Sequence, residues 1–384
     1  MEQEEILRQE AIRLHIQGQS VKMICEQLNR SRQWFYKWLS RYEQSSGTDW
    51  YKNELCIPKT VLNRTEKSME QTVVEIRNRL SAQPFAQRGA INIMYEFERL
   101  GIKAPSISTI NRILQRNNLV GKSEVKRLKD TEYPKFFTGV QQMDLVGPRY
   151  LKGGFRFYFY NIIDTENHFA GVYPIRDKTA ESIVACVVDY WRNYQMPDFL
   201  QMDNELSFRG SNRHPRGLGL VLRVALSNGV SPIFIPPAEP WRNGIIEKFN
   251  NNVQKYFYDT QIFTSFEDLQ EKAKAFTAFH NENHRYSSQG SRTPNQMVRE
   301  ILHKTPLTKK IDLTQKIFIE EGRLIFIRFI RSNLKLCLLN EMFTVNPTLK
   351  YSYVVAEIIL EKYVLVVSQN NTVYHIFPFV MSLP

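Results

Sequence analysis

The spacing of apolar residues changes twice along the 384-residue chain. Up to residue 119, apolar positions recur mainly at helical spacing. Between residues 136 and 303, short runs of β-forming residues alternate with helical segments, which indicates an α/β region. Beyond residue 310, short strand-like runs follow one another closely, which predicts a small β-barrel or sandwich. The pattern therefore predicts a multidomain chain with all-α, α/β and all-β parts in that order.

Residues 1–47 are predicted to form a first module of helices. Ser20 and Ser31 stand where they can cap the second and third helices, and Phe35 and Trp38 share one face of the third. The opposite face carries polar residues suited to DNA contact, namely Arg32, Gln33, Tyr36 and Lys37. This layout is that of a helix-turn-helix, whose last helix enters a major groove, although an ordinary helical hairpin fits the pattern equally well.

Residues 48–121 are predicted to form a second helical, winged-helix-like module. Its last helix, from Ser106, buries Ile110 and Ile113. The exposed face of that helix offers three residues for DNA contact, namely Asn111, Arg112 and Arg116. The following linker, residues 122–135, is basic, and Lys126 and Arg127 are expected to follow a phosphate backbone. A solvated run of charge is the alternative explanation for this linker.

Residues 136–303 are predicted to form an α/β core, and residues 310–384 the small β-barrel. In the core, strands are expected at residues 140–146, 155–163, 169–175 and 231–235, with a further strand ending at Asp203. Helices are expected at residues 179–194, 218–228, 241–258 and 266–281. The resulting order of strands and helices is that of a ribonuclease-H-like fold.

Three acidic residues occupy suggestive positions in this core. Asp144 falls on the first strand and Asp203 at the end of the fourth, so the two can be neighbours at one end of the sheet. Glu247 follows a proline-rich turn and a glycine, near the start of a helix. Two strand-borne aspartates and a helix-borne glutamate can converge on divalent metal, and two-metal sites drive in-line phosphoryl displacement. In a basic chain, this combination indicates the cutting and joining of DNA.

Together these motifs resemble the integrase core shared by retroviral integrases and bacterial insertion-sequence transposases, the aspartate–aspartate–glutamate recombinases. The most specific part is the run from Pro240 to Asn250, in which a proline and an Asn-Gly pair precede the glutamate. The resemblance implies that Asp144, Asp203 and Glu247 form the catalytic, metal-binding triad. It also implies DNA binding by the C-terminal barrel, to which basic residues would contribute, namely Arg323, Arg328, Arg331 and Lys335.

The spacing of the acids departs from the common insertion-sequence pattern. Between Asp203 and Glu247 lie 43 residues, whereas Glu239 would leave 35, the usual gap of the family. Glu239, however, stands between Pro237 and Pro240, where a helix is disfavoured. Glu247 lies on a helix with regular apolar spacing and projects from its polar face. We therefore choose Glu247 and expect the additional residues in the loop 206–219.

Other polar residues near these acids have competing interpretations. By position, four residues are expected to contact DNA phosphates, namely Asn204, Arg242, Asn243 and Lys248. Asp164 is expected to open a turn rather than to join the triad. His280 and His284 have the spacing of half a helical zinc motif, but a third ligand at a convincing spacing is missing. The resemblance instead matches His284 to a structural or DNA-proximal histidine.

Composition supports an interaction with nucleic acid. The net charge of +12 and a pI near 9.4 suit a polyanionic partner. Oxygen ligands without a Cys/His set favour Mg²⁺ or Mn²⁺, two ions per active site, over zinc. The four cysteines are scattered, and neither a signal peptide nor an apolar run of membrane length is present. We therefore expect a cytoplasmic, nucleoid-associated protein that does not bind membranes.

The predicted function is that of a DNA transposase, which cleaves the 3′ strand at element ends and joins it to target DNA. Its partners would be the element's terminal repeats, target DNA and further copies of the chain, forming at least a dimer on DNA. Two alternatives stay open. One is a domesticated DNA-binding regulator that has lost catalysis, and the other is a ribonuclease-H-like nuclease that cuts without joining.

Overall fold

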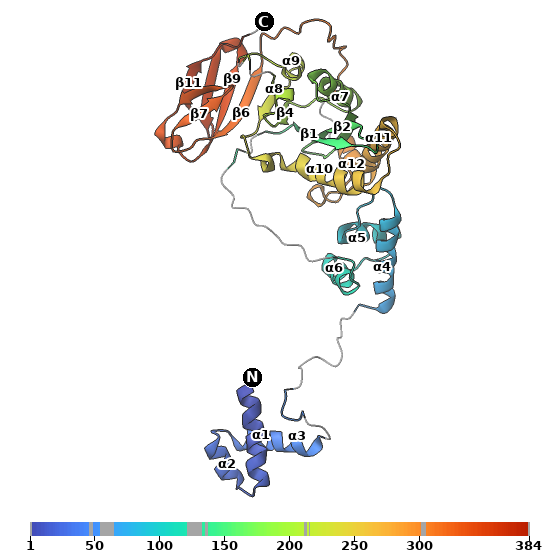
Figure 1. Ribbon diagram of the computed structural model, residues 1–384, viewed down its shortest axis with the longest axis vertical. Helices are drawn as coiled ribbons and strands as arrows, with labels where there is room; N and C mark the ends of the chain where they lie inside the picture. Colours follow the sequence, from blue (N-terminus) through green and yellow to red (C-terminus); the bar gives the residue numbers. More distant parts are fainter. Residues whose placement is uncertain are drawn as a thin grey trace. The chain divides into compact units, whose positions relative to one another are not determined.

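The computed structural model describes residues 2–45, 49–53, 65–120, 133–134, 137–210, 213–214, 216–300 and 305–382 (Figure 1). The chain divides into two compact units, Met1–Glu66 and Lys67–Pro384. Lys126 and Arg127 of the predicted basic linker lie outside the described residues. None of the helices in the described ranges combines the length and the apolar character that crossing a membrane requires.

The first unit contains a helix-turn-helix, as predicted. The Ser20 side chain accepts a hydrogen bond from the backbone N–H of Met23 (3.4 Å), and the Ser31 side chain accepts one from that of Trp34 (3.1 Å). Both serines therefore cap the helices that they precede. Phe35 is buried against apolar side chains of the two other helices. The described residues of this unit form three helices: α1 (Glu2–Ile16), α2 (Val21–Gln27) and α3 (Arg32–Gln44).

A second group of helices opens the larger unit. These helices share a core of their own, which includes Ile93, Ile110 and Ile113. Residues 65–120 contain helices and turns but no strand, so a wing is not seen among them. Phe85, in the turn after the first of these helices, contacts the ring of Phe276 in the α/β core (centroids 5.6 Å apart). The helices are α4 (Lys67–Ala82), α5 (Ala90–Arg99) and α6 (Ile107–Arg116).

The α/β core has the predicted ribonuclease-H-like order of strands and helices. Its first three strands are antiparallel neighbours, and the next two pair in parallel beside the first strand. The fourth strand pairs in parallel with the first half of the first strand. The carboxyl end of the fourth strand and the end of that half therefore lie at the same end of the sheet. The strands are β1 (Val140–Tyr150), β2 (Arg156–Asp164), β3 (Ala170–Ile175), β4 (Phe199–Met202) and β5 (Ser231–Phe234).

Helices cover both faces of this sheet (Figure 1). One layer, with α7 and α9, packs on a face that includes Tyr160 and Ile162 of β2. The opposite layer, with α10 and α11, packs on the face that includes Phe157 and Phe159. The alternation of inward side chains along β2 thus feeds two separate cores. The helices are α7 (Ala180–Asn193), α8 (Leu206–Arg209), α9 (Leu220–Ser227), α10 (Gly244–Tyr256), α11 (Phe266–Asn283) and α12 (Pro294–Glu300).

The C-terminal strands continue the core sheet, so the predicted small β-barrel is not confirmed. Ile233 and Phe234 of β5 pair in parallel with Ile325 and Phe326 of β6. Among the described residues, nine strands form one sheet in the order β11-β10-β9-β6-β5-β4-β1-β2-β3, and β7 and β8 form a separate hairpin. The strands are β6 (Arg323–Phe329), β7 (Lys335–Leu338), β8 (Glu341–Thr344), β9 (Tyr353–Ile359), β10 (Val364–Gln369) and β11 (Thr372–Pro378).

The physical reason lies at the edge of β5. Its outward backbone groups need hydrogen-bond partners, and β6 supplies them. The rings of Phe234 and Phe326 stack with their centroids 4.9 Å apart, which adds apolar burial to the pairing. One of the strand-like runs expected beyond residue 310, at residues 316–319, is irregular. Strand-like spacing therefore identified most of the strands correctly but not the edge to which they attach.

The opposite edge of the sheet, at β3, is closed by side chains of α11. The side-chain amide of Asn281 donates a hydrogen bond to the carbonyl of Ala170 (2.9 Å) and accepts one from the backbone N–H of Ala170 (2.9 Å). One helical turn earlier, the hydroxyl of Thr277 accepts the N–H of Val172 (3.3 Å). These side chains take the place of a further strand, so the backbone groups that they bind cannot pair with another chain.

Candidate active site

Asp144 and Asp203 come from neighbouring strands. β1 and β4 run parallel, with Gln142 opposite Gln201, so each aspartate lies two residues beyond this pair. Glu247 lies in the first turn of α10, which packs on the same strand β1. Burial, together with the negative charges of Asp203 and Glu247, raises the pKa of Asp144 to about 7. The structure therefore places Asp203 and Glu247 within electrostatic reach of Asp144.

Buried amides fix the start of α10 on these two strands. The side chain of Gln142 accepts the backbone N–H of Ile246 (3.0 Å). The side chain of Gln201 donates to that of Asn243 (3.1 Å), and Asn243 is only 3% exposed. Because buried polar groups are costly when unpaired, this network fixes one position of the helix start. It therefore sets where Glu247 emerges relative to the strands of the two aspartates.

The carboxylates themselves have few partners. Asn250 donates to Asp144 (2.7 Å) and is itself held by Asn161, whose amide donates to it (2.8 Å). Asp203 accepts the backbone N–H of Glu205 (2.9 Å). Burial raises the pKa of both Asp203 and Glu247. Asn250 was not anticipated from the sequence, although its position three residues after Glu247, on the same helical face, was the available signal.

The chemistry of this site suits a hard divalent cation. All three acids offer oxygen ligands, which Mg²⁺ and Mn²⁺ prefer. The raised pKa of Asp144 means that its negative charge is not compensated by nearby basic groups. Lys178 is the basic side chain that acts on Asp203, and it pairs with Glu205 (2.6 Å). No three His, Cys, Asp or Glu side chains among the described residues are already close enough to hold one ion together. A cation would have to draw the carboxylates inward.

Glu239, the alternative third acid, is engaged elsewhere. It forms an ion pair with Arg242 (3.1 Å) and accepts a hydrogen bond from the hydroxyl of Tyr353 (2.7 Å). It immediately precedes the 3₁₀ turn η1 (Pro240–Asn243) rather than lying on α10. The negative charge of Glu247 is among the causes that raise the pKa of Asp144. These contacts support the choice of Glu247.

The loop 206–219, expected to hold the additional residues, is pinched at its base. It begins with α8, and the N–H of Gly219 then donates to the carbonyl of Arg209 (3.3 Å). A Cβ atom added to Gly210 would lie 2.9 Å from the backbone of Gly219, so the two ends of the loop are in close contact there. Residues inserted beyond this contact leave the positions of Asp203 and α9 unchanged.

Three of the four predicted phosphate contacts near the acids are engaged in internal interactions. Asn204 donates to the carbonyl of Ile235 (2.7 Å), and Asn243 donates to that of Met143 (3.2 Å). The side chain of Arg242 is 14% exposed and binds Glu239 and Tyr353. Of the four, only Lys248 is exposed, and it remains a predicted phosphate contact.

The predicted DNA-contacting residues of the helical modules lie on helix surfaces. On α3, where Phe35 and Trp38 are buried, the four predicted residues are all exposed: Arg32, Gln33, Tyr36 and Lys37. On α6 the three predicted residues are also exposed, and one of them approaches Glu70 at 3.7 Å: Asn111, Arg112 and Arg116. Both faces are therefore accessible to a partner.

The two histidines with zinc-like spacing belong to a buried aromatic cluster. The rings of His280 and His284 stack at 4.9 Å, and Tyr286 packs 4.3 Å from His284. A third histidine, His168, packs 4.0 Å from Tyr286 and accepts a hydrogen bond from Gln289 (2.9 Å). Burial lowers the pKa of His168 and of His284 to about 4, so both are neutral. Neutral, stacked rings indicate a packing role, which agrees with the first of the two roles, structural or DNA-proximal, that the resemblance implied for His284.

Asp164 behaves as expected from the sequence. Its carboxylate accepts the backbone N–H groups of Glu166 (2.9 Å) and Asn167 (3.2 Å). These bonds form the turn between β2 and β3. Asp164 therefore serves the fold and is not part of the acidic site.

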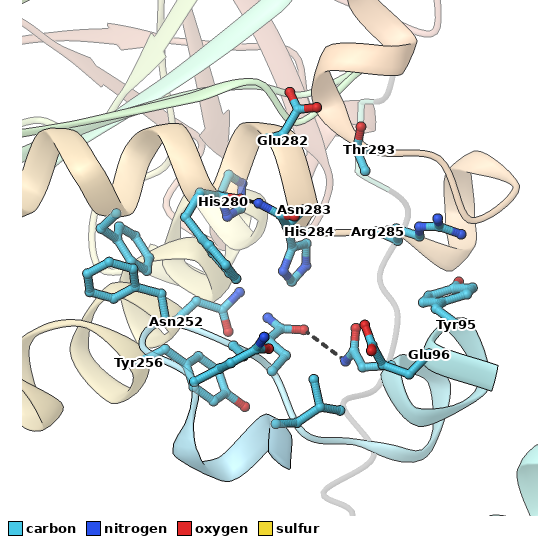
Figure 2. A pocket seen from close by; sticks show the side chains of 18 of the residues that line it. Tyr95, Glu96, Asn252, Tyr256, His280, Glu282, Asn283, His284, Arg285 and Thr293 are labelled. Carbon is cyan, nitrogen blue, oxygen red and sulfur yellow. Dashed lines mark hydrogen bonds between the residues drawn. The ribbon is translucent and has the colours of Figure 1, made fainter. Parts of the chain in front are cut away.

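A pocket of about 190 Å³ adjoins the histidine cluster (Figure 2). It is lined by residues of α4, α5, α10 and α11, including Tyr95, Asn252 and His284. Arg285 lies over the ring of Tyr95 (4.8 Å) and 3.5 Å from Glu98, which joins α5 to the core. None of the three acids lines this pocket. It therefore lies between the second group of helices and the α/β core, and it is separate from the candidate active site.

Comparisons with known families agree with this architecture. The integrase core domain matches residues 228–294, a stretch that includes β5, Glu247 and α11, and the homeodomain-like domain matches residues 2–49. The chain thus carries one match to an integrase core domain and one to a homeodomain-like domain. This confirms the resemblance to the integrase-core recombinases that the sequence motifs indicated.

Comparisons with solved structures give distant likenesses. The catalytic core domain of HTLV-2 integrase in complex with magnesium is 14% identical and matches over 41% of this chain and 93% of its own, with a TM-score of 0.32. The core domain of BIV integrase is 15% identical over 42% and 94%, with a TM-score of 0.31. A chain of the simian T-cell lymphotropic virus intasome is 10% identical over 77% and 93%, with a TM-score of 0.37. No curated protein matches the chain.

Proposed function

We propose that this protein is a DNA transposase that cleaves the 3′ strand at the ends of a mobile element and joins it to target DNA. The observation that carries the proposal is that Asp203 and Glu247 lie within electrostatic reach of Asp144 beside β1, in a chain whose residues 228–294 match an integrase core domain. The net charge of +12 supports a polyanionic partner. Nothing observed favours a regulator without catalysis, since all three acids are present.

Asp144, Asp203 and Glu247 would hold two Mg²⁺ or Mn²⁺ ions. Such ions, when bound, activate the attacking oxygen and stabilise the leaving oxygen of a phosphoryl transfer. The chain's own groups prepare this site. Asn250 orients one oxygen of Asp144 (2.7 Å), and the network of Gln142 sets the position of the helix that carries Glu247. Lys248, exposed beside Glu247, supplies a positive charge for the DNA backbone.

The exposed face of α3 is the proposed reader of element ends, and the exposed face of α6 adds a second contact. Deleting residues 1–47 should erase the preference for end sequences over random duplex, while non-specific binding remains. Footprints on end DNA would measure this. A point variant, Arg32→Ala, with Arg41→Ala on the same helix as its comparison, tests the predicted face more finely. An unchanged footprint after the deletion would overturn the assignment.

The catalytic proposal is tested by incubating the protein with labelled element ends and a plasmid in Mg²⁺ or Mn²⁺. The expected products are 3′-cleaved ends and ends joined to plasmid. Cleaved ends without joined product would favour the nuclease alternative. Specific binding without either product would favour the regulator.

Joining two ends to one target needs two active sites, and one chain carries a single set of acids. We therefore propose at least a dimer on DNA, with closed symmetry. The free protein is expected to be monomeric, because its net charge of +12 opposes self-association until phosphates neutralise it. Light scattering with and without end DNA measures both states. Concerted joining of two ends by a complex with one protein chain would refute the proposal.

A further inference from the structure

The geometry points to a role of the C-terminal strands in shaping the active site: β6 and β9 carry two side-chain clamps that position the residues next to Asp203 and Glu247. This inference rests on the proposed function of those acids. Tyr353, Arg242, Glu239 and Arg328 are then positioning residues, which act through the backbone segments that carry the acids. The C-terminal strands would serve catalysis even without touching DNA.

The first clamp, made by Glu239, Arg242 and Tyr353, holds the turn that leads into α10. Its three polar side chains form a closed ring of contacts. Arg242 donates to Glu239 (3.1 Å) and to the hydroxyl of Tyr353 (2.9 Å), and that hydroxyl donates to Glu239 (2.7 Å). Tyr353 begins β9, more than a hundred residues further along the chain. The ring therefore ties η1, immediately before α10, to the C-terminal part of the sheet.

Aromatic contacts hold the same arginine from two sides. The guanidinium of Arg242 lies 4.1 Å from the ring centre of Tyr133 and 4.8 Å from that of Tyr353. The two tyrosine rings meet edge to face at 5.2 Å. An arginine that is both stacked and hydrogen-bonded has little freedom to change its rotamer. Its backbone carbonyl accepts a hydrogen bond from Gln201 on β4 (3.2 Å), which carries this order into the strand that leads to Asp203.

The second clamp lies immediately after Asp203. Arg328 of β6 is only 8% exposed and donates to the side chain of Asn204 (2.8 Å) and to the carbonyl of Ile235 (3.0 Å). Asn204 in turn donates to the same carbonyl (2.7 Å). Burial lowers the pKa of Arg328 to about 10. This arginine was expected from the sequence to offer positive charge to DNA, and its burial corrects that expectation.

Both clamps connect the C-terminal strands to the segments that carry Asp203 and Glu247. β6 pairs with β5 and β9 pairs with β6, so Arg328 and Tyr353 are fixed by the same sheet that contains β1 and β4. A displacement of this C-terminal part would move η1 and the residue after Asp203 together. Displacing reacting groups by about 1 Å can slow catalysis roughly a hundredfold. The clamps therefore make the rate of the reaction depend on the position of the C-terminal strands.

The test compares Tyr353→Phe with Tyr351→Phe in the full-length protein. Both changes remove one phenolic hydroxyl, but Tyr351 is 61% exposed and its hydroxyl has no hydrogen bond among the described residues. Amide hydrogen exchange of residues 236–247, measured without metal or DNA, should be faster in Tyr353→Phe and unchanged in Tyr351→Phe. The turnover number of Mn²⁺-dependent plasmid nicking should fall roughly tenfold in Tyr353→Phe, while its KM for DNA stays the same.

Two further variants keep the inference falsifiable. Glu239→Gln preserves volume but weakens the ring, so it should repeat both effects and decides the matter if Tyr353→Phe does not fold. Arg328→Lys keeps the charge but loses the forked donor, so it should speed exchange at residues 203–206. If all three variants match Tyr351→Phe in exchange and turnover, the inference is wrong. If Asp144→Asn still nicks DNA, the proposed function fails instead, and the exchange data still judge the clamps.

Discussion

The acidic site and the histidine cluster are both groups of titratable side chains gathered from distant parts of the core, yet their electrostatics differ. Among the acids, burial and like charges act together, and they raise the pKa of Asp144 to about 7. In the histidine cluster, burial lowers the pKa of His168 and of His284 to about 4, so the rings carry no charge. The negative charges of the acids raise the pKa of Asp144, whereas the histidines are neutral and stack.

This difference separates a candidate catalytic site from a structural one. A cluster whose charges repel is unfavourable for folding by itself, which makes it a candidate for a functional site. A cluster of neutral, stacked rings needs no ligand, and its aromatic contacts contribute to stability. The comparison leads us to expect opposite responses of the two groups to substitution, pH and metal.

The largest expected effect is on the reaction. Asp144→Asn, Asp203→Asn and Glu247→Gln should each lower the rate of cleavage and joining by at least about a thousandfold, because each removes an anionic ligand while keeping the volume. DNA affinity in a gel-shift assay should stay nearly unchanged. Normal turnover by Glu247→Gln together with loss in Glu239→Gln would mean that the wrong glutamate was chosen.

The histidine cluster should respond in stability rather than in rate. His280→Ala removes a buried ring that packs 4.8 Å from Phe249, and it should lower the free energy of unfolding by about 2–4 kcal/mol. Denaturation in urea measures this. His214→Ala, at an exposed position, is the matched control and should be neutral. A small loss in His280→Ala would contradict the packing role.

The two groups should give pH dependences of opposite sign in the metal-free protein. The histidines have folded pKa values below the unfolded value of about 6.5, so their contribution is present above pH 6.5 and is lost as the pH falls towards 4. Asp144 has a folded pKa of about 7, above its unfolded value of about 3.9, so its contribution is lost as the pH rises through that range.

The two slopes can be separated by one substitution. Asp144→Asn removes the carboxyl contribution and should therefore steepen the loss of stability on acidification from pH 6.5 to 4, by up to about 1.4 kcal/mol per pH unit. Urea denaturation at several pH values measures the slope. An equal slope in Asp144→Asn and wild type would show that Asp144 ionises normally in the folded protein.

The smallest expected effect is stabilisation by the cation alone. Mg²⁺ or Mn²⁺ at about ten times its dissociation constant should stabilise the protein by about 1.4 kcal/mol, seen as a rise in melting temperature of a few degrees. Chelation should reverse the rise. Asp203→Asn should abolish it, and His280→Ala should keep it. An equal rise in Asp203→Asn would place the ion elsewhere.

Much of this arrangement could be predicted because it depends on local patterns. Strand-like runs and their order predict that Asp144 lies on the first strand and Asp203 at the end of the fourth, which is its neighbour, and the helical spacing after Gly244 places Glu247 on a helix. The cap residues Ser20 and Ser31 act as expected, because capping involves only residues three positions apart.

The remainder depends on contacts between distant residues. Asn204 and Arg242 stand next to the acids in sequence and were therefore expected to bind phosphates, but their partners, Arg328 and Tyr353, lie more than a hundred residues away. His168 lies far from His280 and His284 in the sequence, so its place in their cluster could not be read from local spacing either. The attachment of β6 to β5, in place of a closed barrel, also could not be read from spacing, since local patterns do not specify which edge a strand will pair with.

The pairing of β5 with β6 also has a consequence for synthesis. Ile233 must wait for Ile325, about 90 residues later, whereas the β3 edge is covered once Asn281 has been translated. During translation the nascent chain therefore presents an unpaired edge at β5 for most of its last third, and long delays of this kind favour association between unfinished chains. We expect messages truncated before β6 to yield insoluble protein, so that a premature stop removes the product rather than releasing a shortened one.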